Sequence, residues 1–442
     1  MAKDNIYIMF YRLVSITAGL VLLILLPSTS IVGAGENLSE GDSDVDKIVE
    51  SMSPEERVGQ LFVVTFQGAT LTEDNPVYGL VERYGIGGVV LAGENDNFDD
   101  RESVVGSTRL LITSLQELAV EGVTKSTDDD EQQISLPLLV GIRRQGGVEQ
   151  NSIDTELTFL PSPMAIGATW DVSEAAIMGE IAGFELDALG INLQFGPTLD
   201  VLENPSANNP GDPGMGTFGG NAYWVGELGR EYVAGVHRAS KGRIAFVGQS
   251  FPGLGSGDRG TEVDIPTVNK SLQALFDVDL FPYFALTKGA PGDVGVIDAL
   301  MPAQGRFSAW QGAVTTDTRP LALDSAALGE VMRIPQLSDW RDEGGVIISP
   351  PLGRRGVRRY YDPSGNIFRS YEIARDALLA GNDLLFVDEF EDAAAEDQYV
   401  AITETIGGFV RKYREDAAFA ERVDSAVKRV VSLKLRLYGN DL

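Results

Sequence analysis

The chain lacks cysteine altogether and contains a single histidine, His237, among its 442 residues. The absence of cysteine excludes disulfide bridges, thiolate metal ligands and a thiol nucleophile. One histidine cannot build a multi-histidine zinc site, and no acidic cluster has the spacing of a calcium-binding loop. Walker A, dinucleotide-binding and Gly-x-Ser-x-Gly motifs are also missing. We therefore expect no metal and no cofactor, and a structural role for His237.

Basic residues are scarce relative to acidic ones. The chain has 35 Lys and Arg against 65 Asp and Glu, which gives a formal net charge of −30. Such a surface repels the phosphates of nucleic acids and anionic membrane surfaces. We therefore expect no nucleic-acid partner.

The N-terminal region has the pattern of a targeting segment. Lys3 and Arg12 precede the apolar run Leu13–Leu26, and Pro27 ends that run. A basic start, a short apolar core and small residues beyond it are typical of a signal peptide. We expect residues 1–34 to be a signal peptide that exports the chain.

An N-terminal membrane anchor is the alternative interpretation. Residues 6–26 are nearly long enough to span a bilayer, although Arg12 would then lie inside it. Either interpretation places the rest of the chain outside the cell, at its surface or attached to the membrane facing outward. Residues 35–46 are polar and are expected to be a linker, and residues 47–442 a single domain.

Short apolar runs alternate with amphipathic stretches after residue 47. Continuously apolar runs are typical of parallel strands that are covered on both faces. We expect strands at 61–66, 88–91, 138–142, 192–196, 244–248, 294–300, 346–349 and 383–387. Helices are expected at 101–121, 172–189, 223–239, 325–332 and 371–380. This alternation predicts an α/β fold, a (β/α)8 TIM-type barrel, with an open doubly wound sheet as the alternative.

Several motifs follow one another in a recognisable order. They are MSPEERVGQLF at 52–62, IGGVVL at 86–91, LPSPMAIGA at 160–168, LGINLQFGPTLDV at 189–201, FPG at 251–253, AGNDLL at 380–385 and RVDSAVKRVVSLK at 422–434. In this order they resemble glycoside hydrolase family 3, and most of all its single-domain bacterial β-N-acetylhexosaminidases. The resemblance covers about 50–440 and implies a TIM barrel and O-glycosyl hydrolysis.

The position of the catalytic nucleophile has changed. The resemblance implies the pattern Ile-Ser-Asp-Asp-Leu after the seventh strand, and this chain has Ile348-Ser-Pro-Pro-Leu352. Pro350 therefore stands where the family has its aspartate nucleophile. A retaining glycosidase needs that carboxylate for its covalent intermediate, and proline has no group that can replace it.

The acid/base position has changed as well. On the loop after strand five the family carries an Asp-Ser-His group, whose histidine is the acid/base. Aligned without a gap, Glu262 falls on the histidine and Gly260 on its aspartate partner. Glu262 is a candidate general acid if the loop buries it, and a solvated loop glutamate otherwise.

The sugar-binding positions differ too, although Asp200 is retained. Arg143 stands where the resemblance implies a sugar-binding aspartate, which reverses the local charge. Gln145 replaces a glutamate, and Gln249 and Ser250 replace a Lys-His pair. We take these residues, with Asp200 and Glu262, as the candidate ligand-binding set.

The roles of the charged residues in this set have alternative interpretations. Asp200 can bind a hydroxyl group of a ligand or cap the loop that follows it. Arg143 and Arg144 can bind a carboxylate or phosphate, or form internal ion pairs with Asp200, Glu262 or Asp388.

The sequence therefore favours an exported member of this family that has lost catalysis and binds a glycan or a protein partner in the former cleft. An active glycosidase of the β-N-acetylhexosaminidase or β-glucosidase class is the alternative. It would use Glu262 as acid/base and Asp200 or Asp388 as the second carboxylate. A structural cell-surface protein is a further alternative.

Overall fold

A computed structural model describes residues 40–99, 103–124, 136–147, 152–203, 205, 214–388 and 395–439. Its centre is a sheet of eight parallel strands in the order β10-β1-β2-β3-β4-β5-β7-β9. Their bounds are β1 Phe62–Thr65, β2 Gly88–Leu91, β3 Leu139–Arg143, β4 Leu193–Phe195, β5 Ala245–Phe251, β7 Ala299–Pro302, β9 Val346–Ile347 and β10 Leu385–Val387. A parallel bridge between Ile348 and Leu384 joins the two outer strands, so the sheet closes on itself.

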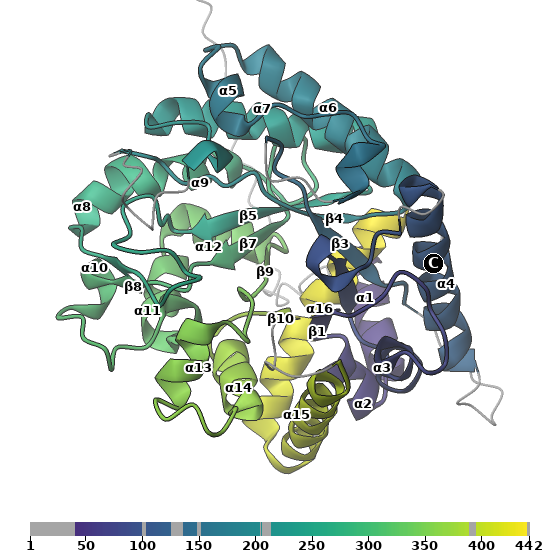
Figure 1. The fold of residues 1–442 in the computed structure, drawn as a ribbon. Helices are drawn as coiled ribbons and strands as arrows, with labels where there is room; N and C mark the ends of the chain where they lie inside the picture. Colours follow the sequence, from purple (N-terminus) through teal and green to yellow (C-terminus); the bar gives the residue numbers. More distant parts are fainter. Residues whose placement is uncertain are drawn as a thin grey trace, which may run out of the picture.

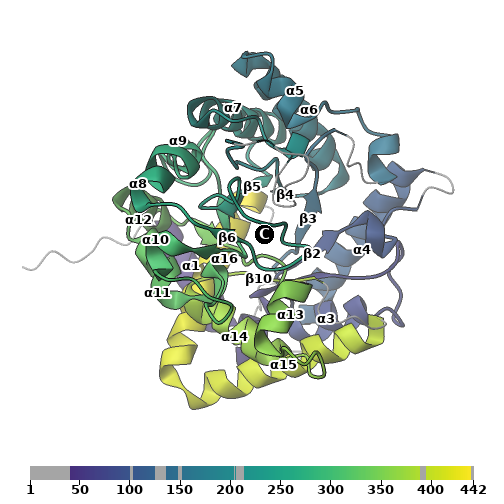
Figure 2. The same cartoon turned by 60° about the vertical axis from the view of Figure 1, so that its left-hand side comes forward.

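Helices form the outer layer around the strands (Figure 1 and Figure 2). The longer ones are α1 Glu40–Ser51, α3 Pro76–Tyr84, α4 Val104–Thr124, α6 Val172–Leu189, α7 Ala222–Ser240, α11 Ser325–Met332, α12 Pro335–Asp342, α14 Ser370–Ala380, α15 Ala395–Glu415 and α16 Ala417–Tyr438. The predicted (β/α)8 TIM-type fold is therefore confirmed. The bounds of α6 and α11 coincide with the predicted ranges.

Two hydrophobic layers explain why each strand is apolar throughout. Alternate residues such as Val63, Leu139 and Val346 form a cluster inside the barrel. Their neighbours, such as Val64 and Val140, pack outward into the larger cluster shared with the helices. Side chains on a strand alternate between its faces, so a run that is buried on both must be apolar at every position.

Helix α16 contributes to the same interior cluster through Val430, Leu433 and Leu437. This explains why the closing helix is amphipathic: one of its faces completes the core of the barrel. The catalytic face of a TIM barrel is the opposite one, where the strands end.

The largest difference from the predicted strands is at β7. The range 294–300 was expected, and the strand is Ala299–Pro302. Gly292 and Gly295 adopt φ of +97° and +85°, in the left-handed region that extended strands do not use. Val294 therefore belongs to a turn, and Val296 and Ile297 lie in irregular backbone before the strand.

The start of the domain also differs from the prediction. Helix α1 begins at Glu40, inside the range 35–46 that was expected to be a linker. Its residues Val45, Ile48 and Val49 are buried in the core. Within the described side chains of the expected linker, Val45 is buried and Asp44 is exposed, as on a helix that packs one face on the core.

A small additional sheet was not predicted. β6 Thr267–Val268 pairs in parallel with β8 Arg306–Phe307. Pairs of two residues are too short for a periodicity to appear in the sequence.

None of the helices in the described ranges is long and apolar enough to cross a membrane. The expected signal peptide or anchor at 1–34, and the first part of the expected linker, lie outside those ranges.

Candidate ligand-binding cleft at the mouth of the barrel

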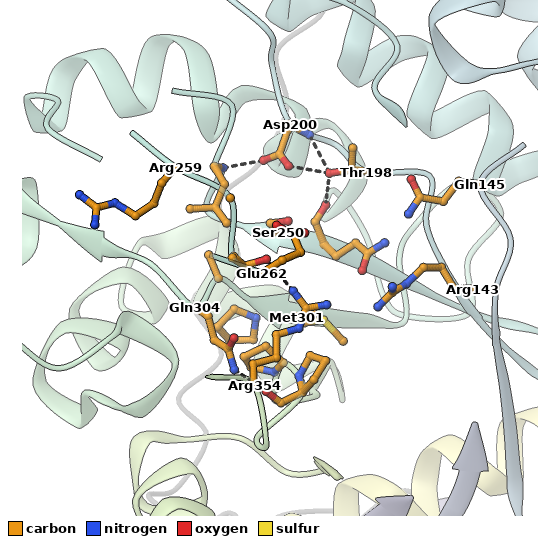
Figure 3. A pocket seen from close by; sticks show the side chains of 18 residues that line it. Arg143, Gln145, Thr198, Asp200, Ser250, Arg259, Glu262, Met301, Gln304 and Arg354 are labelled. Atoms are coloured by element: carbon orange, nitrogen blue, oxygen red, sulfur yellow. Dashed lines mark hydrogen bonds between the residues drawn. The ribbon is translucent and has the colours of Figure 1, made fainter. Parts of the chain in front are cut away.

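A cavity of about 310 Å³ opens where the strands end (Figure 3). It is lined by all six candidate ligand-binding residues and by the replaced nucleophile position: Arg143, Gln145, Asp200, Gln249, Ser250, Glu262 and Pro350. These residues come from the ends of β3, β4, β5 and β9 and from the loops that follow. The carboxyl ends of barrel strands build the active sites of TIM-barrel enzymes.

Pro350 presents an apolar surface to this cavity. It follows β9, is buried, and has Pro351 beside it in the lining. Ser349 holds the segment in place: its hydroxyl accepts a hydrogen bond from the Phe386 N–H at 2.9 Å and donates one to the Pro350 carbonyl at 3.0 Å. Gln304 donates to the carbonyl of Pro351. The seventh strand therefore offers the cavity a fixed apolar wall without a titratable group.

Asp200 is buried and engaged within the protein. Its Oδ1 accepts a hydrogen bond from the Leu254 N–H at 2.6 Å, and its Oδ2 accepts one from Thr198 Oγ1 at 2.7 Å. Burial raises the pKa of this carboxyl, although the hydrogen bonds from Leu254 and Thr198 oppose the rise. Asp200 thus ties the loop after β4 to the loop after β5.

Glu262 lies in an exposed turn at the edge of the cavity. Gly260, where the resemblance implies an aspartate partner, is buried and also lines the cavity. Glu262 is therefore exposed to solvent and also lines the cavity. Because residue 260 is glycine, it offers no side chain that could orient the Glu262 carboxylate.

The two adjacent arginines after β3 have different surroundings. Arg144 is buried and forms ion pairs with Asp154 at 3.0 Å and with Glu185 at 2.9 Å. The expected internal ion pair therefore exists for Arg144, but with other partners than those expected. Arg143 shares the strand face of Leu139, which points into the barrel, and lines the cavity.

Arg354 is the other arginine that reaches into the cavity. Its Nη1 donates a hydrogen bond to Thr261 Oγ1 at 2.5 Å. The sequence groups it with Arg355, Arg358 and Arg359, but these three belong to helix α13 Arg355–Tyr361 and do not line the cavity. Arg259 also contributes to the lining and pairs with its neighbour Asp258 at 2.7 Å.

A second cavity, of about 210 Å³, adjoins the first and shares Arg143 and Gln145 with it. Asp388 and Glu94 supply acidic groups there, and Asp388 accepts a hydrogen bond from Thr65 Oγ1 at 3.1 Å. Burial raises the pKa of Asp388, and the nearby Arg143 works against the rise. Asp388, a candidate second carboxylate, therefore lines a different cavity from Glu262.

Several lining residues were missed from the sequence. Thr198 and Gln304 follow strands four and six, so the rule that strand ends build the site indicates both of them. Thr261 and Arg259 lie on the long loop after β5, whose path no periodicity encodes.

His237 lies apart from the cavity, on α7. Its Nε2 is 3.0 Å from Asp298 Oδ2, and its Nδ1 is 3.2 Å from the carbonyl oxygen of Asp293. Arg436 Nη2 approaches the other oxygen of Asp298 at 3.3 Å. His237 therefore belongs to a buried charge network in the core. Within the described part of the chain, no three His, Asp or Glu side chains are grouped so that they could hold a metal ion.

Comparison with known families gives one match that spans most of the chain. The model of the glycosyl hydrolase family 3 N terminal domain matches residues 53–433. A beta-N-acetylglucosaminidase/beta-glucosidase of Cellulomonas fimi is 25% identical over 402 residues, which cover 90% of this chain and 60% of that protein. A beta-hexosaminidase of Bordetella parapertussis is 28% identical over 346 residues, covering 76% of this chain and 81% of that one.

Solved structures agree with these sequence matches. A glycoside hydrolase family 3 beta-N-acetylglucosaminidase from Paenibacillus sp. str. FPU-7 superposes with a TM-score of 0.69 at 26% identity, covering 87% of this chain and 63% of that one. The beta-N-acetylhexosaminidase of Beutenbergia cavernae gives a TM-score of 0.66 at 25% identity, covering 87% of this chain and 98% of that one. The chain spans 54% of the length of the similar beta-hexosaminidase A of Pseudoalteromonas piscicida and 60% of the Cellulomonas protein.

Proposed function

Since this chain belongs to glycosyl hydrolase family 3, through its N-terminal domain, we propose that it is an exported member that binds a glycan in the cleft and does not hydrolyse it. The relatives are named as hexosaminidases and glucosidases. Their substrates motivate the choice of a saccharide as the ligand.

The observation that carries this proposal is the position of Pro350. The residue lines the same cavity as Asp200 and Glu262, at the end of the seventh strand. Hydrolysis with retention needs a carboxylate that attacks the anomeric carbon, and proline cannot supply one. The wall that it forms can still pack against the apolar face of a sugar ring.

The other lining groups support binding. Gln145, Gln249, Ser250 and Thr261 present amide and hydroxyl groups, which donate and accept the hydrogen bonds that sugar hydroxyls make. Pockets for small ligands combine an apolar lining with a few polar groups that fix orientation. Met301 and Pro302 extend the apolar part.

The alternative with relocated carboxylates finds less support in the same cavity. Both oxygens of Asp200 already accept a hydrogen bond from the protein, so only part of the accepting capacity of this carboxylate remains for a ligand. Glu262 and Asp388 line separate cavities. Glycoside hydrolysis uses two carboxylates that flank one glycosidic bond. In the cavity that Glu262 lines, the second carboxylate, Asp200, is engaged by hydrogen bonds from the protein.

Calorimetric titration of the exported domain with a panel of oligosaccharides tests binding directly. We expect saturable binding that weakens at least tenfold in Gln249→Ala, because this variant removes a hydrogen-bonding side chain from the cavity. Gln273→Ala is the matched control, since Gln273 lies exposed on α8 Leu272–Ala274. Absence of binding to any saccharide, or equal loss in both variants, would refute the proposal.

A further inference from the structure

We propose that the ligand of the cleft is an anionic saccharide, whose carboxylate or phosphate group is held between Arg143 and Arg354. This inference rests on the proposed glycan-binding function and names the class of glycan.

The protein carries a formal charge of −30, yet the cavity at the mouth of the barrel is lined by three arginines, Arg143, Arg259 and Arg354. Two carboxylates, Asp200 and Glu262, are in the same lining. The hydrogen bonds of Asp200 are directed at Leu254 and Thr198 rather than at the arginines. Arginine therefore supplies three of the five charged side chains in the lining, although Arg259 is already paired with Asp258. The guanidinium groups of Arg143 and Arg354 are the cationic groups that can attract an anion to this cavity.

The two inner arginines face one another. Figure 3 shows the guanidinium ends of Arg143 and Arg354 directed toward each other, whereas that of Arg259 points away. They come from opposite sides of the mouth, Arg143 from the end of β3 and Arg354 from the segment after β9. A guanidinium group presents a planar fork of N–H donors that matches the geometry of carboxylate and phosphate oxygens.

An existing contact fixes the direction of the Arg354 fork. Arg354 is half-buried, and its bond to Thr261 at 2.5 Å uses Nη1. Both arginines also lie near the carboxyl of Asp388. Burial raises the pKa of that carboxyl, and the positive charges of Arg143 and Arg354 act against the rise. Side chains that are already oriented lose less entropy when an anion binds.

The apolar wall explains why the anion belongs to a saccharide. Pro350, Pro351 and Met301 lie beside the arginines in the lining. A bare inorganic anion would leave these surfaces in water, whereas a sugar ring covers them and places its hydroxyls toward Gln249 and Ser250. A charged group on the ring then reaches the two guanidinium groups.

The test is calorimetric titration of the exported domain with a matched set of ligands. Glucuronate carries a carboxylate, glucose 6-phosphate a phosphate, and glucose and N-acetylglucosamine no charge. We expect at least one anionic sugar to bind ten times more tightly than the neutral ones, with an affinity that falls as sodium chloride increases. The two anions distinguish a carboxylate from a phosphate site.

Substitutions assign the effect to the two arginines. Arg143→Gln and Arg354→Gln are each expected to weaken binding of the anionic sugar about tenfold and to weaken binding of neutral sugars much less. Arg355→Gln is the matched control, because Arg355 is the exposed neighbour that does not line the cavity. Thermal unfolding of every variant verifies that it is folded.

The outcomes separate this inference from the proposed function. If neutral saccharides bind as tightly as anionic ones, or if both variants bind like the wild type, the inference is overturned and glycan binding stands. If no saccharide binds, the proposed function fails and the inference fails with it.

Discussion

Arg354 donates a hydrogen bond from Nη1 to Thr261 Oγ1 over 2.5 Å, and this bond joins the segment after β9 to the loop after β5. In an active relative implied by the resemblance, these two places carry the nucleophile and the acid/base. Here the guanidinium group of Arg354 and the hydroxyl group of Thr261 connect these two segments. This contact therefore joins the two segments at which the resemblance implies the catalytic groups, and it makes no use of a carboxylate.

Removing that contact should loosen the loop. In Thr261→Val the hydroxyl acceptor is lost while the shape of the side chain is kept, so we expect the free energy of unfolding to fall by about 1–2 kcal/mol. Amide hydrogen exchange around residues 258–263 should become faster. Thr113→Val, on the exposed face of α4, is the control and should change neither quantity. Unchanged exchange in Thr261→Val would show that the loop is held by other contacts.

Asp200 should tolerate the loss of its charge but not of its hydrogen bonds. In Asp200→Asn the amide oxygen can still accept from Leu254 N–H, and Thr198 Oγ1 can donate instead to the Gln249 carbonyl, 3.1 Å away. Because burial raises the pKa of Asp200, a neutral side chain is suited to this site. We expect Asn to cost at most about 1 kcal/mol of stability and Ala about 2–3 kcal/mol.

Thermal unfolding of the two variants measures the difference. Equal losses in Asn and Ala would mean that the negative charge itself stabilises the two loops, which would contradict this expectation. An Asn variant that keeps both its stability and its glycan affinity supports the role of loop cap.

The buried amine of Lys434 should destabilise the folded protein at neutral pH. It lies on α16, is fully buried and donates to Gln60 Oε1 at 2.7 Å. Burial lowers its pKa to about 7. The unfolded chain binds this proton up to its ordinary pKa of 10.5, so the contribution of Lys434 to stability is greatest above pH 10.5 and is lost as the pH falls toward 7.

We therefore expect Lys434→Met to raise the melting temperature at pH 7. The corresponding gain in the free energy of unfolding is at most about 4 kcal/mol. The gain should shrink as the pH approaches 10. Lys428→Met is the control on the same helix, since Lys428 is about half exposed and should shift stability by less than about 0.5 kcal/mol. A gain that does not depend on pH would contradict the assignment to proton binding.

His237 should give the opposite pH dependence. Burial disfavours its charged ring, but Asp298 outweighs this and raises the pKa of His237. The stability that it contributes is complete below its ordinary pKa of 6.5 and is lost as the pH rises through the raised value. The melting temperature of the wild type relative to His237→Gln should therefore fall as the pH increases above 6.5. Parallel profiles for the two proteins would refute the charged pair.

Much of the fold could be predicted because the barrel strands are buried on both faces. Runs such as Val346–Ile347 are apolar at every position, and this pattern leaves few alternatives to a parallel sheet. The site positions could be located because each follows such a run. The first part of helix α1, residues 40–46, was expected to be a linker because that stretch is polar, and Val45 is its one buried apolar residue.

The arrangement within the site could not be predicted. Arg143 and Arg144 are equivalent in the sequence, and only the register of β3 decides which one faces the cavity. The bond between Arg354 and Thr261 joins residues 93 positions apart, through a loop without periodic signal. Side-chain roles of this kind depend on tertiary packing rather than on local pattern.

The absence of catalysis is the central claim, and hydrolysis of a panel of aryl β-glycosides, including the β-N-acetylglucosaminide, tests it most directly. Wild type and Glu262→Gln would be assayed side by side. The account predicts that both release aryl alcohol no faster than buffer alone. Turnover by the wild type that Glu262→Gln abolishes would contradict it, and would show that catalysis has moved away from position 350.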